Sequence, residues 1–211
     1  APPVNGSGAG GVTRPPDGRP SVGARVFALQ LQAVPGPDAL SGLLQAQRVY
    51  PAQETGWRPL PSGSLHLTVQ PILDPVEIRQ AQVLQPGAAM SMLAGLGPIC
   101  SESPAFEIVL DRVTRLGAAI VALGEAPAPL AALRRRLIHE LIGLRLPVRT
   151  LEIAHVTLFR CDLGKGQPPT APPSMPIKVR MRVGALRLIE EKVFPSLEVE
   201  ILRTFELGGA C

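Results

Sequence analysis

Residues 64–69 read Ser-Leu-His-Leu-Thr-Val, and residues 153–158 read Ile-Ala-His-Val-Thr-Leu. Each stretch places a histidine and a threonine two positions apart among apolar residues. Side chains of a β-strand alternate between its two faces, so His66 and Thr68 share one face, as do His155 and Thr157. The apolar neighbours point to the opposite faces, where they can pack in a core. The two stretches therefore predict two similar strands, each presenting an imidazole beside a hydroxyl.

Short apolar strands and a few helices are predicted around these two stretches. We expect strands over residues 25–32, 64–72, 106–114, 118–124 and 151–160, a closing pair over 177–190 and 194–205, and helices over 38–48, 76–84, 88–96 and 127–144. The turn at Leu116-Gly117 predicts a hairpin. In the helix over 127–144, leucines recur three and four residues apart, and the run Arg134–Arg136 is assigned to the solvated face. Hairpins beside crossover connections favour the α+β class.

Length and composition limit the number of domains and indicate the cellular location. The 211 residues suit one domain, and eleven of the first 24 are Gly or Pro, so residues 1–24 are predicted to form a disordered tail and residues 25–211 one folded domain. The block 164–176 reads as a long surface loop. No apolar run approaches the length of a membrane span. Three scattered cysteines and no secretory signal favour a reducing, cytoplasmic location. The net charge of +4 suits a phosphate-bearing partner without demanding one.

Two imidazoles and two hydroxyls are suited to acid–base chemistry on a phosphodiester. One neutral imidazole can accept a proton from the attacking nucleophile, and a protonated one can donate to the leaving oxygen. Threonine hydroxyls can donate hydrogen bonds to the phosphoryl oxygens. The sequence has no cluster at zinc-ligand spacing, so we expect neither metal nor cofactor. The alternative for either motif alone is a half-buried strand histidine bonded to its own threonine.

The paired His-x-Thr motifs resemble those of the 2H phosphoesterase superfamily, in particular its branch of bacterial RNA 2′,3′-cyclic phosphodiesterases, also called 2′-5′ RNA ligases. The resemblance covers about residues 25–207. It implies an α+β fold of two lobes related by a pseudo-two-fold, with small antiparallel sheets, helices outside and a central cleft. It also implies that His66 and His155 form the acid–base pair and that Thr68 and Thr157 hold the phosphate.

The resemblance implies metal-independent hydrolysis of 2′,3′-cyclic phosphate ends of RNA or nucleotides to 2′-phosphates. The reverse reaction with a 5′-hydroxyl RNA end would form a 2′-5′ linkage. Two alternatives stay open: a module of the same fold that binds a nucleotide or an RNA end without turnover, and an enzyme for a small cyclic phosphate metabolite. We expect a monomer, and the sequence does not distinguish the acid histidine from the base.

Four further residues are candidates for substrate contacts: Gln70, Arg160, Tyr50 and Trp57. Gln70 has the strand parity of His66 and Thr68. Arg160 would suit a phosphate, but regular alternation puts it on the opposite face from His155, so it needs a bulge or a strand end to turn inward. Tyr50 and Trp57 precede the first motif in a predicted loop and could stack against a base.

The strand after the long loop carries a basic row. Lys178, Arg180 and Arg182 alternate with apolar residues, so one face of this strand is positively charged. The simpler interpretation is a sheet edge protected by charge, and the alternative is a track for an RNA backbone.

Overall fold

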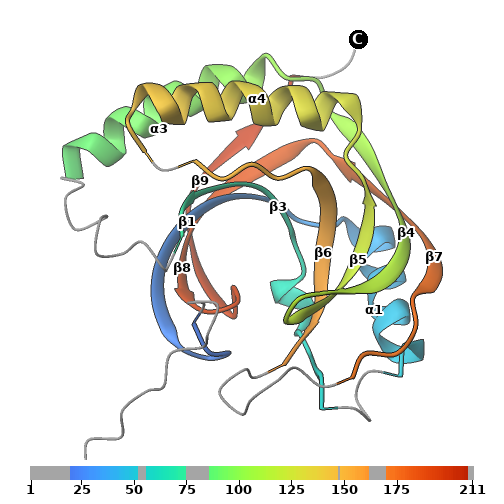
Figure 1. Cartoon of the computed structure of the whole chain (residues 1–211). Coiled ribbons are helices and arrows are strands. Elements are labelled where there is room, and N and C mark those ends of the chain that lie inside the picture. Colours follow the sequence, from blue (N-terminus) through green and yellow to red (C-terminus); the bar gives the residue numbers. More distant parts are fainter. Residues whose placement is uncertain (1–19, 52–55, 75–85, 147, 162–169, 209–211) are drawn as a thin grey trace, which may run out of the picture.

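One curved antiparallel sheet organises the computed structural model, which describes residues 20–51, 56–74, 86–146, 148–161 and 170–208, with the backbone alone for 86–93 (Figure 1). The described strands are β1 (Arg25–Ala33), β2 (Arg58–Pro59), β3 (Leu67–Leu73), β4 (Phe106–Leu116), β5 (Ala119–Glu125), β6 (Ile153–Arg160), β7 (Met175–Val183), β8 (Ala185–Val193) and β9 (Glu198–Glu206). The described helices are α1 (Pro37–Val49), the short 3₁₀ helix η2 (Ser62–Ser64), α3 (Pro86–Ser101) and α4 (Ala128–Gly143).

The strand order divides the sheet into two halves. It runs β7-β4-β5-β6-β3-β1-β8-β9, with β2 added beside β6. The halves meet where β6 and β3 lie side by side, and there the ladder consists of one bridge, Leu67 to Val156. These two strands carry the His-x-Thr motifs. The meeting point of the two halves therefore coincides with the candidate site.

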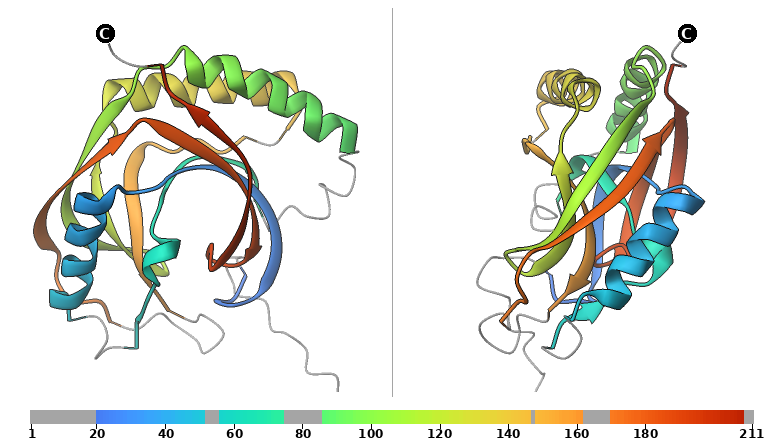
Figure 2. Two further views of the ribbon diagram at one scale, coloured as in Figure 1. Left: turned by 180° about the vertical axis from the view of Figure 1, so that it is seen from behind. Right: turned by 90° about the vertical axis from the view of Figure 1, so that its right-hand side faces the viewer.

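Helices cover the outer side of the curved sheet. α3 and α4 pack side by side along one end, and α1 lies against the half that contains β6 and β7 (Figures 1 and 2). Leu130, Leu133, Leu137 and Leu141 of α4 are all buried in the main core, as their three- and four-residue spacing predicts. The apolar positions of β3 and β6 enter the same core from the sheet, which leaves their other face for the motif side chains.

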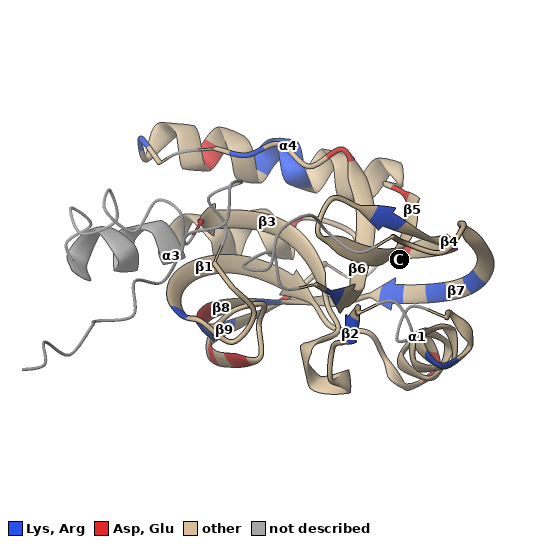
Figure 3. Cartoon of the chain, turned by 60° about the horizontal axis from the view of Figure 1, so that its bottom comes forward, with Lys and Arg blue, Asp and Glu red and all other residues tan. Residues whose placement is uncertain are grey.

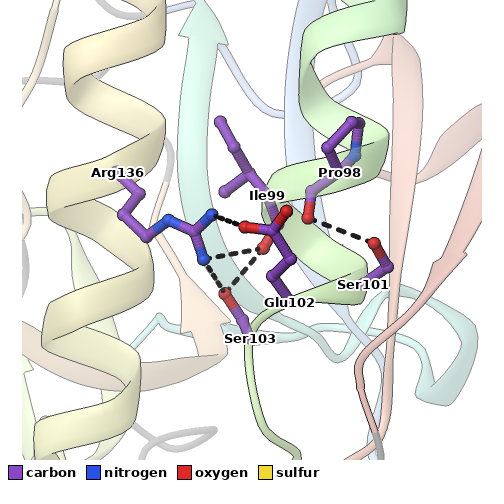
Figure 4. A network of polar contacts seen from close by, with 6 residues as sticks. All are labelled: Pro98, Ile99, Ser101, Glu102, Ser103 and Arg136. Carbon is purple, nitrogen blue, oxygen red and sulfur yellow. Dashed lines mark hydrogen bonds and ion pairs between the residues drawn. The ribbon is translucent and has the colours of Figure 1, made fainter.

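Arg136 joins α4 to the C-terminal end of α3. Its guanidinium pairs with the Glu102 carboxylate and donates at 3.5 Å each to the Ile99 carbonyl oxygen and the Ser103 hydroxyl (Figure 4). The last turn of a helix leaves carbonyls without intrahelical donors, so a cation there is favourable. The contact holds the two outer helices together away from the motif strands.

Most predicted elements are present, and the α+β class is confirmed. The hairpin joins β4 to β5 through Gly117, whose φ of +57° lies in the left-handed region. The predicted closing pair of strands is wrong, because the chain breaks at Gly184 and forms three strands, β7, β8 and β9. None of the helices in the described ranges combines the length and apolar content that a membrane crossing requires.

Several predicted segments lie outside the described residues. They include residues 1–19 of the predicted tail, the predicted helix over 76–84, and residues 164–169 of the predicted surface loop.

Candidate functional site

The two His-x-Thr motifs occupy equivalent places in the two halves of the sheet. His66 directly precedes β3, which contains Thr68, and both His155 and Thr157 lie in β6. All four are partly exposed, whereas the intervening Leu67 and Val156 are fully buried. The predicted alternation of faces is therefore present in both strands.

The strand register brings the motifs together. Leu67 is the antiparallel partner of Val156. In an antiparallel ladder the flanking residues face one another, which sets His66 opposite Thr157 and Thr68 opposite His155 on the same face. Each imidazole thus lies beside the hydroxyl of the other motif. Four groups from segments far apart in the sequence gather around one place on the sheet.

A β-bulge follows the threonine of each motif. Gln32 pairs with Thr68 while Leu31 pairs with Gln70, which leaves Val69 as the extra residue of β3. In β6 the extra residue is Leu158, since its neighbours Thr157 and Phe159 pair with consecutive residues of β5. A bulge inserts one residue into a ladder and reverses the alternation beyond it.

The bulges decide the positions of Gln70 and Arg160. Gln70 turns into the core with no exposed surface, where its amide donates to the Pro71 and Arg149 carbonyls at 3.0 Å each. Its predicted place beside His66 and Thr68 is therefore wrong, because the bulge at Val69 shifts the parity. The bulge at Leu158 also reverses the alternation, and here it turns Arg160 from the core side to the side of His155.

Arg160 lies close enough to act on several groups of the site. Its guanidinium carbon is 5.3 Å from the centroid of the Phe194 ring. Burial lowers the pKa values of His66 and His155, and the positive charge of Arg160 adds to this lowering. Burial raises the pKa of the Glu191 carboxyl, and the charge of Arg160 opposes that rise. Regular alternation would turn Arg160 away from His155, and the bulge at Leu158 removes that obstacle.

Tyr50 and Trp57 do not form an exposed base platform. Both rings are buried, at 1% and 2% exposure. The Tyr50 hydroxyl donates to the Pro172 carbonyl at 2.8 Å, and the Trp57 indole donates to the Thr170 carbonyl at 3.4 Å. Both rings hold the segment that precedes β7 against the core, which corrects the prediction that a base stacks on them.

The hydrogen bond of His66 selects its tautomer. Nδ1 lies 2.8 Å from the Ser64 carbonyl oxygen. A carbonyl can only accept, so Nδ1 carries the proton, and in the neutral ring Nε2 has a free lone pair. Burial lowers the pKa of His66 to about 4, with the Ser64 contact opposing and Arg160 reinforcing this shift. His66 is thus neutral near pH 7, with Nε2 able to accept a proton.

His155 is also held neutral, and by more neighbouring charges. Burial is the largest cause that lowers its pKa to about 4, followed by the charges of Arg160, Arg134, His66 and Arg149. The interaction with His66 places the two imidazoles within electrostatic reach of each other. Two neutral rings beside a guanidinium form a site that is suited to receive an anion.

A polar network that sequence reasoning missed leads away from Thr68. The Thr68 hydroxyl donates to Gln30 Oε1 at 3.1 Å, and Gln30 and Gln32 donate to the Ser196 hydroxyl at 3.2 and 3.1 Å. The Ser196 backbone amide and hydroxyl in turn donate to the buried Glu191 carboxyl. The signal in the sequence was the pair of glutamines two residues apart in the first strand, which must share one face.

The basic row lies on β7, the terminal strand of the described sheet on that side. Lys178, Arg180 and Arg182 are exposed, and the row is visible in Figure 3. Arg180 pairs with Glu107 at 2.7 Å, so part of the charge is neutralised. Among the described residues there is no group of three or more His, Cys, Asp or Glu side chains arranged to hold a metal ion.

Comparisons with known proteins find similarity in structure rather than in sequence. Neither a protein-family model nor a curated protein sequence matches the chain. Among solved structures, E. coli LigT complexed with NADP+ aligns over 88% of this chain and 99% of its own, at 15% identity and a TM-score of 0.67. TT0787 of Thermus thermophilus aligns over 87% and 100%, at 21% identity and a TM-score of 0.64. A structure described as a phosphoesterase aligns over 87% and 99%, at 15% identity and a TM-score of 0.67.

These similarities establish the fold. The chain shares the α+β fold of these solved structures over nearly their full length. LigT has also been crystallised with ATP, with phosphate and with 3′-AMP.

Proposed function

We propose that this protein is a phosphodiesterase that opens 2′,3′-cyclic phosphates of RNA ends or nucleotides to 2′-phosphates without a metal. One observation carries the proposal: the register of β3 and β6 sets the imidazole of each His-x-Thr motif opposite the hydroxyl of the other. The nucleotide and phosphate complexes of LigT, which shares the fold, support a phosphate-bearing ligand.

In the proposed reaction, water attacks phosphorus and the bond to the 3′ oxygen breaks. His66 is suited to the role of base, because its Nδ1 proton is engaged by Ser64 and Nε2 is free to accept the proton of water. His155 then protonates the departing 3′ oxygen. Run in reverse, with a 5′-hydroxyl RNA end in place of water, the same groups would form a 2′-5′ linkage.

The scheme needs one protonated histidine, and the negative charge of the bound phosphate favours that protonation. Both histidines have pKa values of about 4 in the free protein, so His155 is seldom protonated near neutral pH. A bound phosphodiester anion between the rings raises the pKa of both and allows one to hold a proton. Arg160 and the hydroxyls of Thr68 and Thr157 would stabilise the phosphoryl oxygens, which requires Thr68 to turn its proton away from Gln30.

The test is turnover of a nucleoside 2′,3′-cyclic phosphate with a chelator present. The proposal expects hydrolysis to the 2′-phosphate, and a loss of about a hundredfold or more in His66→Ala and in His155→Ala, since each acid–base role contributes about 10²–10⁴ in rate. His139→Ala is the matched control, because His139 is exposed on α4. Full activity in either motif variant would refute the mechanism.

The same assay separates the alternatives. Saturable binding of the nucleotide without turnover of cyclic or 2′-5′ substrates would favour a binding module. An oligonucleotide end processed faster than the mononucleotide, with a rate that falls steeply with salt, would favour RNA as the substrate. Neutralising Lys178 and Arg182 together should reduce that salt dependence if β7 contacts the RNA backbone.

A further inference from the structure

The three consecutive arginines of α4 do not share a face. Successive residues of an α-helix are turned by about 100°, so a run of three spreads over about 200° of the helix surface. Arg135 is exposed and Arg136 reaches α3, whereas Arg134 is 3% exposed. Its position between Leu130 and Leu137 follows the buried stripe of the helix. The assignment of Arg134 to a solvated face is therefore wrong.

The Arg134 guanidinium donates to four backbone carbonyls that flank the two motifs. Nε donates to Val69 O at 3.0 Å and Nη2 to Thr68 O at 3.2 Å, both in β3. Nη1 donates to Leu151 O and Ile153 O at 3.0 Å each, on the segment that enters β6. One side chain of α4 thus joins the strand of the first histidine to the strand of the second.

The geometry of the strands explains why an arginine is needed there. Consecutive carbonyls of a regular strand point to opposite edges, but the bulge at Val69 lets those of Thr68 and Val69 reach the same guanidinium. The ladder between β3 and β6 consists of a single bridge, which by itself leaves the spacing of the strands weakly specified. The planar guanidinium of Arg134 adds hydrogen bonds to both strands with its donors in a fixed geometry. The ammonium group of a lysine could not reproduce that geometry.

We propose that Arg134 is the positioning residue that sets the separation of the two motif histidines. Its guanidinium does so by hydrogen-bonding to backbone carbonyls of both β3 and the segment that enters β6. The inference rests on the proposed function for its kinetic consequence, but its structural consequence can be measured without any substrate. The hydrogen bonds of Arg134 go to the backbone of the two strands, so its effect on the positions of the histidines is transmitted by the strands.

The positive charge of Arg134 also lowers the pKa of His155, after the larger effect of burial. Burial lowers the pKa of Arg134 to about 10, so it remains a cation at neutral pH. The charged groups that face His155 are Arg160, Arg134, His66 and Arg149, and each of them lowers its pKa. For His66, Arg160 is the neighbouring charge that lowers the pKa. Removing the charge of Arg134 should therefore raise the pKa of His155 selectively.

Two substitutions separate geometry from charge. Arg134→Lys keeps the cation but loses the planar fork, and Arg134→Met loses both. Arg135→Met is the matched surface control. Arg136→Met is the control for helix packing, because it removes the link between α4 and α3 shown in Figure 4 without touching the motif strands.

The readouts are kcat and KM on a 2′,3′-cyclic nucleotide, the melting temperature, and NMR titration of the imidazoles, of which the chain has only three. We expect Arg134→Lys to lower kcat about tenfold or more with KM little changed, since misplaced catalytic groups lose rate before binding. The pKa of His155 should stay unchanged in Arg134→Lys and rise in Arg134→Met, with that of His66 unaffected. Arg136→Met should lose thermal stability and keep its kcat.

A wild-type kcat in Arg134→Lys would overturn the inference. The inference would also be overturned if Arg136→Met lost as much kcat as Arg134→Lys while the two variants had the same melting temperature. The loss of kcat would then reflect packing of the helix. If Arg134→Met does not fold, Arg134→Lys still decides the geometric claim. If the wild-type protein turns over no cyclic nucleotide, the proposed function fails. The inference about Arg134 is then decided by whether the motif histidines of Arg134→Lys show changed mutual NOE distances.

Discussion

Burial of the two motif histidines should make folding stability depend on pH in a calculable way. Both have a pKa of about 4 in the folded protein, against the ordinary value of 6.5. In the window between these values the unfolded chain binds more protons, so stability is full above pH 6.5 and falls as the pH drops toward 4. Between pH 7.5 and 4.5 each histidine should remove roughly 2–3 kcal/mol of unfolding free energy.

Urea unfolding at the two pH values measures this loss, and asparagine variants isolate each histidine. Asparagine does not titrate, and in His66→Asn its amide can keep the hydrogen bond to the Ser64 carbonyl. His66→Asn and His155→Asn should each reduce the difference in unfolding free energy between the two pH values by roughly 2–3 kcal/mol, and the double variant should reduce it by about twice as much. His139→Asn, at an exposed position on α4, is the control. Contributions from other groups, such as the raised pKa of Glu191, are common to all variants and cancel.

The reasoning is refuted if both asparagine variants keep the wild-type pH dependence. Such a result would mean that the motif histidines titrate alike in the folded and unfolded chains and are not desolvated. The conclusion that burial holds both imidazoles neutral would then fail, whereas the tautomer of His66 rests on its contact with Ser64 and would stand.

Three further predictions concern catalysis and the support of the site. The kcat/KM for a cyclic nucleotide should rise as the pH falls from 8 toward 5, because this ratio reports the free protein, in which the fraction with one protonated histidine grows in that direction; a rise with increasing pH in rate profiles would contradict the two pKa values. Arg160→Met should lower kcat/KM about 10–100-fold, the loss of a charge-assisted contact of about 1.5–3 kcal/mol, and raise the pKa of both histidines by NMR; unchanged kinetics would place the phosphate elsewhere. Gln47→Met should lower the free energy of unfolding by about 2–6 kcal/mol, because the buried Gln47 amide donates to the Leu60 and Leu158 carbonyls at 2.9 and 2.7 Å; a change below about 1 kcal/mol in urea titrations would mean that water satisfies both carbonyls.

Local pattern was sufficient for the elements that carry the chemistry. The alternation of apolar and polar residues predicts which face His66 and His155 occupy, since each face of a strand is decided within a few residues. The leucine spacing of α4 and the turn at Gly117 are local in the same way, and both are present. The resemblance of the paired motifs then predicted the fold that the solved structures share.

The sequence by itself determined that two imidazoles and two hydroxyls stand on the open faces of two strands, because strand alternation depends only on neighbouring residues. Only the tertiary structure decided that these strands are adjacent and bulge after each threonine, which buries Gln70 and turns Arg160 toward the histidines. It likewise decided that Arg134 is buried beneath both strands. A bulge and a buried cation are each stabilised by partners far away in the chain, and so neither leaves a local pattern to read.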